Sequence, residues 1–154
     1  MKETIEQAKE ELKRVDHLYY VSLKYTKTVD VIKNIIQRLI NAYSFTIDAL
    51  AIYLKNKKKL KTIPNNPIEK AEEIRNIFKD DKDFSDNIDF YFFLRKLNRA
   101  EFTRAREFRR HVTMGAKVDG KSYDITIDVI EVYYERAKIF VEKAYKLIHG
   151  IKDE

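Results

Sequence analysis

Residues 127–148 read IDVIEVYYERAKIFVEKAYKLI and carry the clearest periodic pattern in the chain. Their apolar side chains recur in alternating steps of three and four, which is the spacing of one face of an α-helix. The members of this stripe are Ile127, Ile130, Tyr134, Ala137, Val141, Ala144 and Ile148. A stripe that continues over this length is typical of a helix that packs lengthwise in a bundle. These residues predict one long helix and indicate the fold class.

Four segments before this stretch repeat the same spacing. They predict helices from Ile5 to about Tyr25, from a cap at Thr28 or Asp30 to Lys55, from Pro67 to Phe78, and from a start at Ser85 or Asp86 to Val112. The fourth of these helices places Phe108 and Val112 on its apolar side. The chain has only three Gly and two Pro, so few positions favour a turn or a helix end. We therefore expect an all-α fold, an up-and-down bundle of about five helices.

The segment from Thr113 to Ser122 contains Gly115 and Gly120 and is predicted to be a loop before the last helix. The following run, Ile125-Thr126-Ile127, is β-branched and would suit a short strand. The helical spacing that begins at Ile127 is much longer than this run, and its length favours a helix.

Composition limits the class of protein. The 154 residues match the size of a single domain, residues 1–154, and an apolar content of 44% is enough for one core. The absence of Cys excludes disulfides, a thiol nucleophile and a Cys-based zinc site, which is typical of a reducing compartment. No apolar run reaches the ~18 residues of a membrane span, and the charged N-terminus lacks a secretory signal. We expect a cytoplasmic protein without a membrane partner.

Two of the predicted helices carry apolar residues beyond a single stripe. These are Ile35, Ile40 and Ile47 on the second helix, and Tyr133, Phe140 and Leu147 on the last. Apolar surface that one copy of the chain leaves exposed favours association through helix faces. The pattern therefore predicts a homodimer.

The formal charge of +6 is unevenly distributed. The lysines between Lys55 and Lys61 follow a predicted helix end, where cations are favoured by the helix dipole. Between Arg95 and Arg110, seven of sixteen residues are basic, and most of these are arginines. Guanidinium groups suit phosphate oxygens, so a helical ridge of Arg99, Thr103, Arg106 and Arg110 would follow a nucleic-acid backbone. Ion pairs to glutamates of a neighbouring helix explain such a ridge equally well.

One of the three histidines, His111, comes at the end of this arginine-rich segment and just before the predicted loop. A side chain at that position can project into an open cleft. An unperturbed imidazole titrates near pH ~6.5 and can both take and give a proton. Cleavage of RNA needs a base for the 2′-OH proton, cations for the charged phosphorane and an acid for the leaving 5′-oxygen. An imidazole among guanidinium groups matches these needs.

At these residues the sequence resembles HEPN domains. The run Arg106-Glu107-Phe108-Arg109-Arg110-His111 is similar to their R-x(4–6)-H motif, and Arg104 to His111 fits the longest spacing. The resemblance implies a dimeric helical bundle and a metal-independent ribonuclease without a cofactor, in which two motifs meet across the dimer. It implies that Arg106 and His111 are the catalytic pair. It also implies phosphate or RNA contacts from Arg99, Arg104, Arg109 and Arg110.

Two points of the resemblance stay open. On an ideal helix Arg104 shares the face of His111, whereas Arg106 lies roughly 140° away, so either arginine can be the partner of His111. In toxin members that pair with a separate nucleotidyltransferase, a Tyr follows the motif His by two residues. This chain has Thr113 at that position.

The sequence therefore predicts an RNA-binding protein that acts as a metal-independent endoribonuclease. The alternative is a non-catalytic helical module that dimerises, holds a nucleotide or serves as scaffold or partner of a nucleotidyltransferase. Two other chemistries lack their motifs. A di-metal carboxylate bundle needs inward Glu plus Glu-x-x-His pairs, and Glu107 with His111, four residues apart, has no second such pair beside it. A nucleotide-binding loop needs a glycine-rich run.

Overall fold

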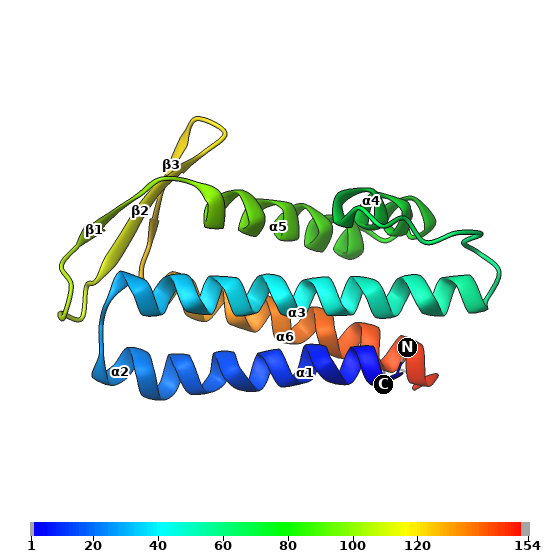
Figure 1. Ribbon diagram of the computed structural model, residues 1–154, viewed down its shortest axis with the longest axis horizontal. Coiled ribbons are helices and arrows are strands. Elements are labelled where there is room, and N and C mark those ends of the chain that lie inside the picture. Colours follow the sequence, from blue (N-terminus) through cyan, green and yellow to red (C-terminus); the bar gives the residue numbers. More distant parts are fainter. Residues whose placement is uncertain (1, 152–154) are drawn as a thin grey trace.

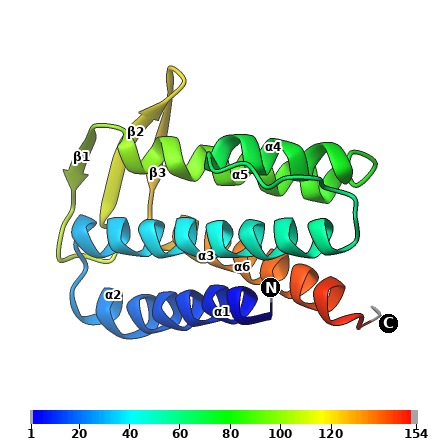
Figure 2. The same ribbon diagram turned by 45° about the vertical axis from the view of Figure 1, so that its right-hand side comes forward.

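Four long helices lie side by side in the computed structural model, which describes residues 2–151. They are α1 (Lys2–His17), α3 (Val29–Asn56), α5 (Lys82–Arg99) and α6 (Ile127–His149). Helix α3 is central: it packs on α1, α5 and α6, while the shorter α4 (Pro67–Ile77) covers α3 and α5 (Figures 1 and 2). The predicted helical bundle is confirmed in this coarse sense, because most of the described chain is helical.

Helix boundaries follow local capping chemistry. The Thr28 side chain accepts a hydrogen bond from the Val31 N–H and begins α3, so Thr28 is the cap and not Asp30, the other predicted candidate. Asn66 and Asp81 cap α4 and α5 in the same way, so α5 begins at Lys82 and not at Ser85 or Asp86. The first predicted helix continues from α1 to Tyr25 through a π-helical turn, η1 (Leu18–Ser22), and a final turn, α2 (Leu23–Tyr25).

The core lies along α3. Tyr43, near the middle of this helix, stacks on the rings of Tyr91 and Phe140. Its hydroxyl is buried and donates a hydrogen bond to the Asn87 Oδ1 over 2.8 Å, which satisfies the polar end of the ring. One copy of the chain thus brings three of its four long helices around a single aromatic cluster.

The apolar side chains that were expected to drive dimerisation are covered within one copy of the chain, so the physical reason for a homodimer is wrong. Ile35, Ile40, Ile47 and Phe140 are buried within one copy, and Tyr133 and Leu147 are half-buried. A single chain covers these side chains because α3 is enclosed by α1, α5 and α6. The exposed apolar residues of α6 are instead Val132 and Ile139. The dimer itself stays a prediction.

The fourth helix is much shorter than predicted. Helix α5 ends at Arg99, and Ala100 is already extended with ψ 149°. The chain then forms an antiparallel sheet in the order β1 (Phe102–Ala105), β2 (Thr113–Val118) and β3 (Lys121–Ile125). The expectations of a helix to Val112, of a loop from Thr113 to Ser122 and of an all-α fold are therefore wrong.

Burial of alternate residues explains why this segment is a sheet. Met114, Ala116 and Val118 are buried on one side of β2, while the residues between them point outward. The sheet packs this apolar side against α5 and α3. Such alternation has the period of a strand, and it lies in the segment that was expected to be a loop. None of the helices within residues 2–151 combines the length and the apolar character that are needed to cross a membrane.

Candidate nucleic-acid interface

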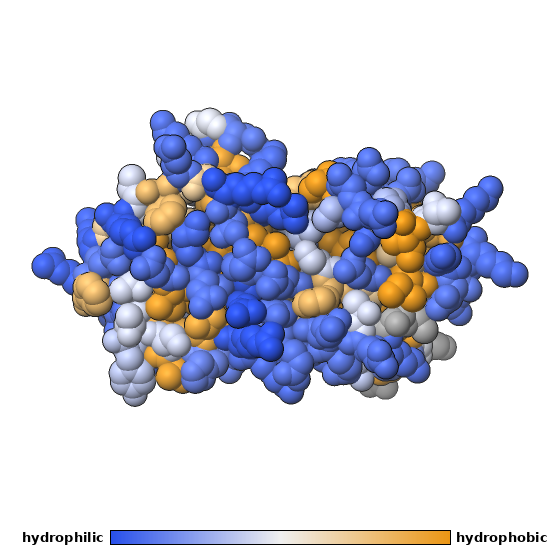
Figure 3. Space-filling view, viewed as in Figure 1, coloured by the Kyte–Doolittle hydropathy of each residue, from blue (hydrophilic) through white to orange (hydrophobic). Residues whose placement is uncertain are grey.

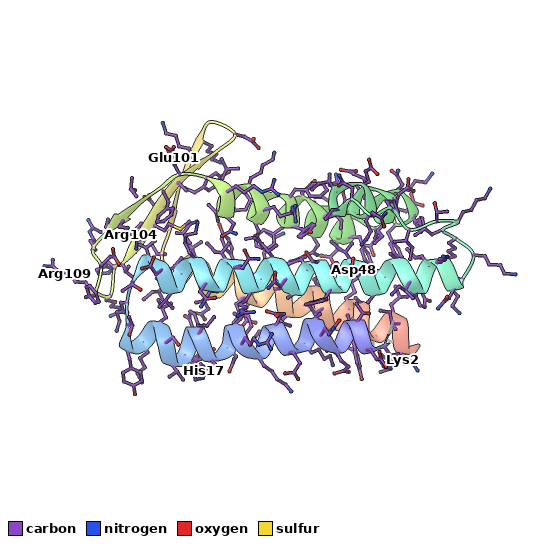
Figure 4. All side chains as sticks on the ribbon, in the orientation of Figure 1. Lys2, His17, Asp48, Glu101, Arg104 and Arg109 are labelled. Carbon is purple, nitrogen blue, oxygen red and sulfur yellow. The ribbon has the colours of Figure 1, made fainter. Side chains whose placement is uncertain are left out.

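Four of the six predicted site residues, Arg106, Arg109, Arg110 and His111, lie on the connection between β1 and β2, at one end of the bundle. We call residues 106–112 the arginine loop. We call this loop, together with the segment from Lys24 to Asp30, the basic end. Figure 4 labels Arg104 on β1 and Arg109 in the arginine loop, and both lie at this end of the molecule. Hydrophilic side chains dominate the face in Figure 3, and apolar side chains emerge among them near the hairpin.

The arginine loop is held against the turn that leads into α3. The Phe108 N–H donates a hydrogen bond to the Lys27 carbonyl over 2.6 Å. The Glu107 carboxylate accepts one from the N–H of Val29, in the first turn of α3, over 3.3 Å. Val112 is fully buried and anchors the far end of the loop. These contacts fix the backbone from which the arginines project.

Arg104 is engaged with two carboxylates. Its guanidinium lies 2.8 Å from Asp30 and 3.7 Å from Glu107. The hydrogen bond from Arg104 lowers the pKa of Asp30, and the same bond raises the pKa of Arg104. Two anions therefore already balance this charge, and Arg104 braces the hairpin against α3. That arrangement favours Arg106 over Arg104 as the free arginine of the motif.

Three arginines of the loop are free. The side chains of Arg106, Arg109 and Arg110 are exposed and form no hydrogen bond or ion pair with any residue that the structure describes. Each therefore presents its full donor fork to solvent, where it can meet a phosphate. The loop brings together three of the predicted arginines.

Arg99 is not part of this group. It is the last residue of α5, whereas the arginine loop begins after β1. A strand of four residues spans roughly 13 Å, so β1 separates Arg99 from the loop. The predicted ridge of Arg99, Thr103, Arg106 and Arg110 is therefore wrong, because no single helix carries these residues.

His111 lies at the boundary between the arginine loop and α6. It is exposed and, with Arg110, lines a small depression of about 150 Å³ whose other wall is Thr126, Ile127 and Asp128. The N-terminus of α6 contributes a partial positive charge to this depression, while the carboxylate of Asp128 opposes it. The backbone carbonyl of His111 accepts a hydrogen bond from the Thr113 hydroxyl over 2.8 Å. The side chain is open to solvent, as proton transfer to a ligand requires.

Arg106 and His111 therefore belong to one loop but not to one helix. No hydrogen bond joins their side chains within the described part of the chain. The backbone of Arg106 is left-handed, with φ 54°, so its side chain leaves the loop in a direction that a helical spacing does not predict. Helical geometry thus has no bearing on which arginine accompanies His111.

Two exposed aromatic residues, Phe108 and Tyr25, also lie at this end, and neither was expected there from the sequence. Phe108 was expected on the apolar side of a helix, but 76% of the residue is exposed at the centre of the arginine loop. Tyr25, at the end of α2, is 78% exposed. The flanking residues held a signal, since an aromatic surrounded by Arg106, Glu107, Arg109 and Arg110 has no apolar neighbours in the chain. Its four charged neighbours are typical of a surface loop.

No group of three or more His, Cys, Asp and Glu side chains within residues 2–151 is arranged to hold a metal ion. Comparison with protein-family models, with curated proteins and with solved structures gives no match for this chain.

Proposed function

We propose that the protein binds RNA at its basic end and cleaves it by metal-independent transesterification, with His111 as a proton-transfer group. One observation carries the proposal: an exposed imidazole shares its loop with three exposed guanidinium groups that have no carboxylate partner among the described residues, and lines one depression with Arg110. The fixed loop backbone supports it, because charges on a docked loop are already positioned for a phosphate chain.

The chemistry assigns a role to each group. Arg109 and Arg110 bind phosphates next to the cleaved bond, and Arg106 stabilises the negative charge of the phosphorane. His111 takes the proton from the 2′-OH, whose oxygen then attacks phosphorus. The bond from phosphorus to the 5′-oxygen breaks, and an acid gives that oxygen a proton. The products are a 2′,3′-cyclic phosphate and a 5′-hydroxyl.

The resemblance to HEPN domains suggests the source of the second proton-transfer group. In that family two motifs meet across a dimer, so the His111 of a second copy would act as the acid. We therefore include a homodimer and a cytoplasmic location in the proposal. The mass of the protein in solution, measured by light scattering, tests the dimer independently of activity.

Cleavage of a labelled single-stranded RNA in the presence of EDTA tests the function. We expect 2′,3′-cyclic phosphate ends, no cleavage of the matching DNA, and a loss of at least about 100-fold in rate for His111→Ala. His17→Ala is the matched control, because His17 is an exposed histidine at the end of α1. Unchanged cleavage by His111→Ala, or activity that EDTA abolishes, would contradict the proposal. Binding without any cleavage would favour the non-catalytic module.

A further inference from the structure

The two most exposed large apolar side chains of the described chain both lie at the basic end. They are Tyr25 and Phe108, exposed at 78% and 76%. They belong to segments in direct contact, because the N–H of Phe108 donates to the carbonyl of Lys27, two residues after Tyr25. Apolar residues scattered singly over a surface need no explanation, but two exposed aromatic rings at the same end of a protein indicate an interaction site.

The backbone holds Phe108 outward. Its φ is 65°, in the left-handed region that bulky residues rarely adopt. Such conformations persist where surrounding contacts impose them, and they concentrate at functional sites. Here the contact is the hydrogen bond to Lys27, while the buried side chain of Val112 already anchors the loop. The ring of Phe108 is therefore not needed as an anchor and stays in solvent.

Cations accompany both rings, along the chain for Phe108 and in space for Tyr25. Arg106, Arg109 and Arg110 belong to the same loop as Phe108, and the Lys24 Nζ lies 5.8 Å from the centre of the Tyr25 ring. Exposed rings among cations are how proteins hold single-stranded nucleic acid, because bases stack on the rings while cations contact the backbone. In an A-form duplex the base faces are stacked inside the helix and out of reach of such rings.

We infer that the basic end selects unpaired nucleotides, with Phe108 and Tyr25 as stacking platforms for bases. This inference rests on the proposed function and specifies its substrate class as single-stranded RNA. Arginines alone would bind single strands and duplexes through their phosphates without this preference. The rings supply the discrimination, since only an exposed base offers them a face.

Binding measurements with three RNA probes separate stacking from charge. The probes are a labelled oligouridylate, the same strand in a blunt duplex, and a strand of equal length without bases. We expect Phe108→Ala to weaken binding of the oligouridylate about tenfold and to leave the affinity for the strand without bases unchanged. Phe108→Leu, which keeps an apolar side chain, should behave like Phe108→Ala. Val132→Ala is the control for a loss of exposed apolar surface elsewhere.

A second readout reports stacking directly. The chain has no Trp, so Phe108→Trp introduces a single tryptophan at the site, whose emission can be excited apart from that of the tyrosines. We expect the oligouridylate to quench its emission and the baseless strand to leave it unchanged, whereas Val132→Trp should respond to neither probe.

The outcomes distinguish the two proposals. If RNA binds and Phe108→Ala binds all probes like the parent protein, the stacking inference is wrong and RNA binding stands. If no probe binds, the proposed function fails and the inference fails with it. If Phe108→Ala instead turns a dimer into a monomer, the rings form an interface between copies, and the inference is overturned.

Discussion

The guanidinium of Arg104 lies 2.8 Å from the carboxylate of Asp30 and joins strand β1 to the first turn of α3. Glu107 extends this link, because it contacts both Arg104 and the N–H of Val29. The contacts explain how a polar hairpin keeps one orientation on the bundle. They also separate Arg104 on β1, which holds the structure, from the three arginines of the basic end, which are free to bind.

The link to Arg104 makes stability depend on pH through Asp30. Because the pKa of Asp30 is lower in the folded protein, the carboxylate stabilises the fold above its unfolded pKa of about 3.9. This contribution is lost as the pH falls through the folded pKa. We expect Asp30→Asn to lower the free energy of unfolding near pH ~6, and this difference from the parent protein to shrink toward pH ~3. Urea denaturation at a series of pH values measures it.

The control for this prediction is Asp86→Asn, at an exposed aspartate of α5 without an ion pair to a described residue. A difference between Asp30→Asn and the parent protein that grows as the pH falls would contradict the sign of the predicted effect.

The free arginines should set the salt dependence of RNA binding. Each guanidinium that contacts a phosphate releases counterions, so Arg106→Ala or Arg110→Ala should reduce the slope of log affinity against log salt by about 0.7 for a single strand. Arg104→Ala should change this slope less, because Asp30 and Glu107 already balance its charge. Fluorescence anisotropy at increasing salt concentrations measures these slopes.

Lys61→Ala serves as the comparison, since this exposed lysine follows α3 at the opposite end of the bundle. Equal slopes for Arg104→Ala and Arg106→Ala would remove the distinction between bracing and binding arginines.

The pairing of β1 with β2 can be tested at Gly115. Its register partner is Thr103, and a Cβ added to Gly115 would lie 2.6 Å from the Thr103 Oγ1. Gly115→Ala should therefore destabilise the protein, by about 1 kcal/mol, through this overlap. Thr103→Ala removes the overlapping atom, so the double variant should regain most of the lost free energy of unfolding.

The double-mutant cycle reports the sheet itself, because a helix through residues 99–112 would not bring Thr103 onto Gly115. Purely additive effects of the two substitutions would speak against this register.

The hydrogen bond between Tyr43 and Asn87 should stabilise the core. Tyr43→Phe leaves the buried Oδ1 of Asn87 without its donor, which costs roughly 1–2 kcal/mol of unfolding free energy. Urea denaturation of Tyr43→Phe measures this loss. Tyr53→Phe is the control, because Tyr53 is half-exposed and its hydroxyl has no hydrogen-bond partner among the described residues. Equal stability of Tyr43→Phe and the parent protein would refute the importance of the bond.

Burial of Tyr43 also predicts a loss of stability in alkali. Desolvation raises the pKa of Tyr43 above its ordinary value, so the folded state keeps the hydroxyl neutral while the unfolded chain ionises above about pH 10. The stabilisation by the neutral group is present below that pH and is lost as the pH rises further. Tyr43→Phe should therefore lose less stability than the parent protein as the pH rises from about 10 to about 12. Thermal melting across this range provides the measurement, and identical losses would contradict it.

Local sequence signals predicted the helices well where one face of the helix meets the core. The spacing from Ile127 to Ile148 matches α6, and the cap at Thr28 matches the start of α3. Both features act within a few residues along the chain, so a sequence displays them directly. The start of α5 was misplaced because Asp81 caps it earlier than Ser85, and both residues are ordinary caps.

The hairpin was not predictable in this way. Strand β1 has one face on Asp30 and the α3 turn and the other in solvent, so it carries no apolar alternation of its own. Its residues become a strand because β2 pairs with them, and β2 is fixed by burial of Met114, Ala116 and Val118 on α5 and α3. Such stabilisation comes from segments far apart in the chain.

The sequence by itself determined a mainly helical bundle, the ends of most helices and the clustering of arginines before His111, because periodicity, capping and charge are local properties. Only the tertiary structure decided that these arginines lie on a docked loop, that Arg104 is paired while Arg106, Arg109 and Arg110 are exposed, and that Phe108 points into solvent. Each of these outcomes depends on which distant segment packs against the hairpin.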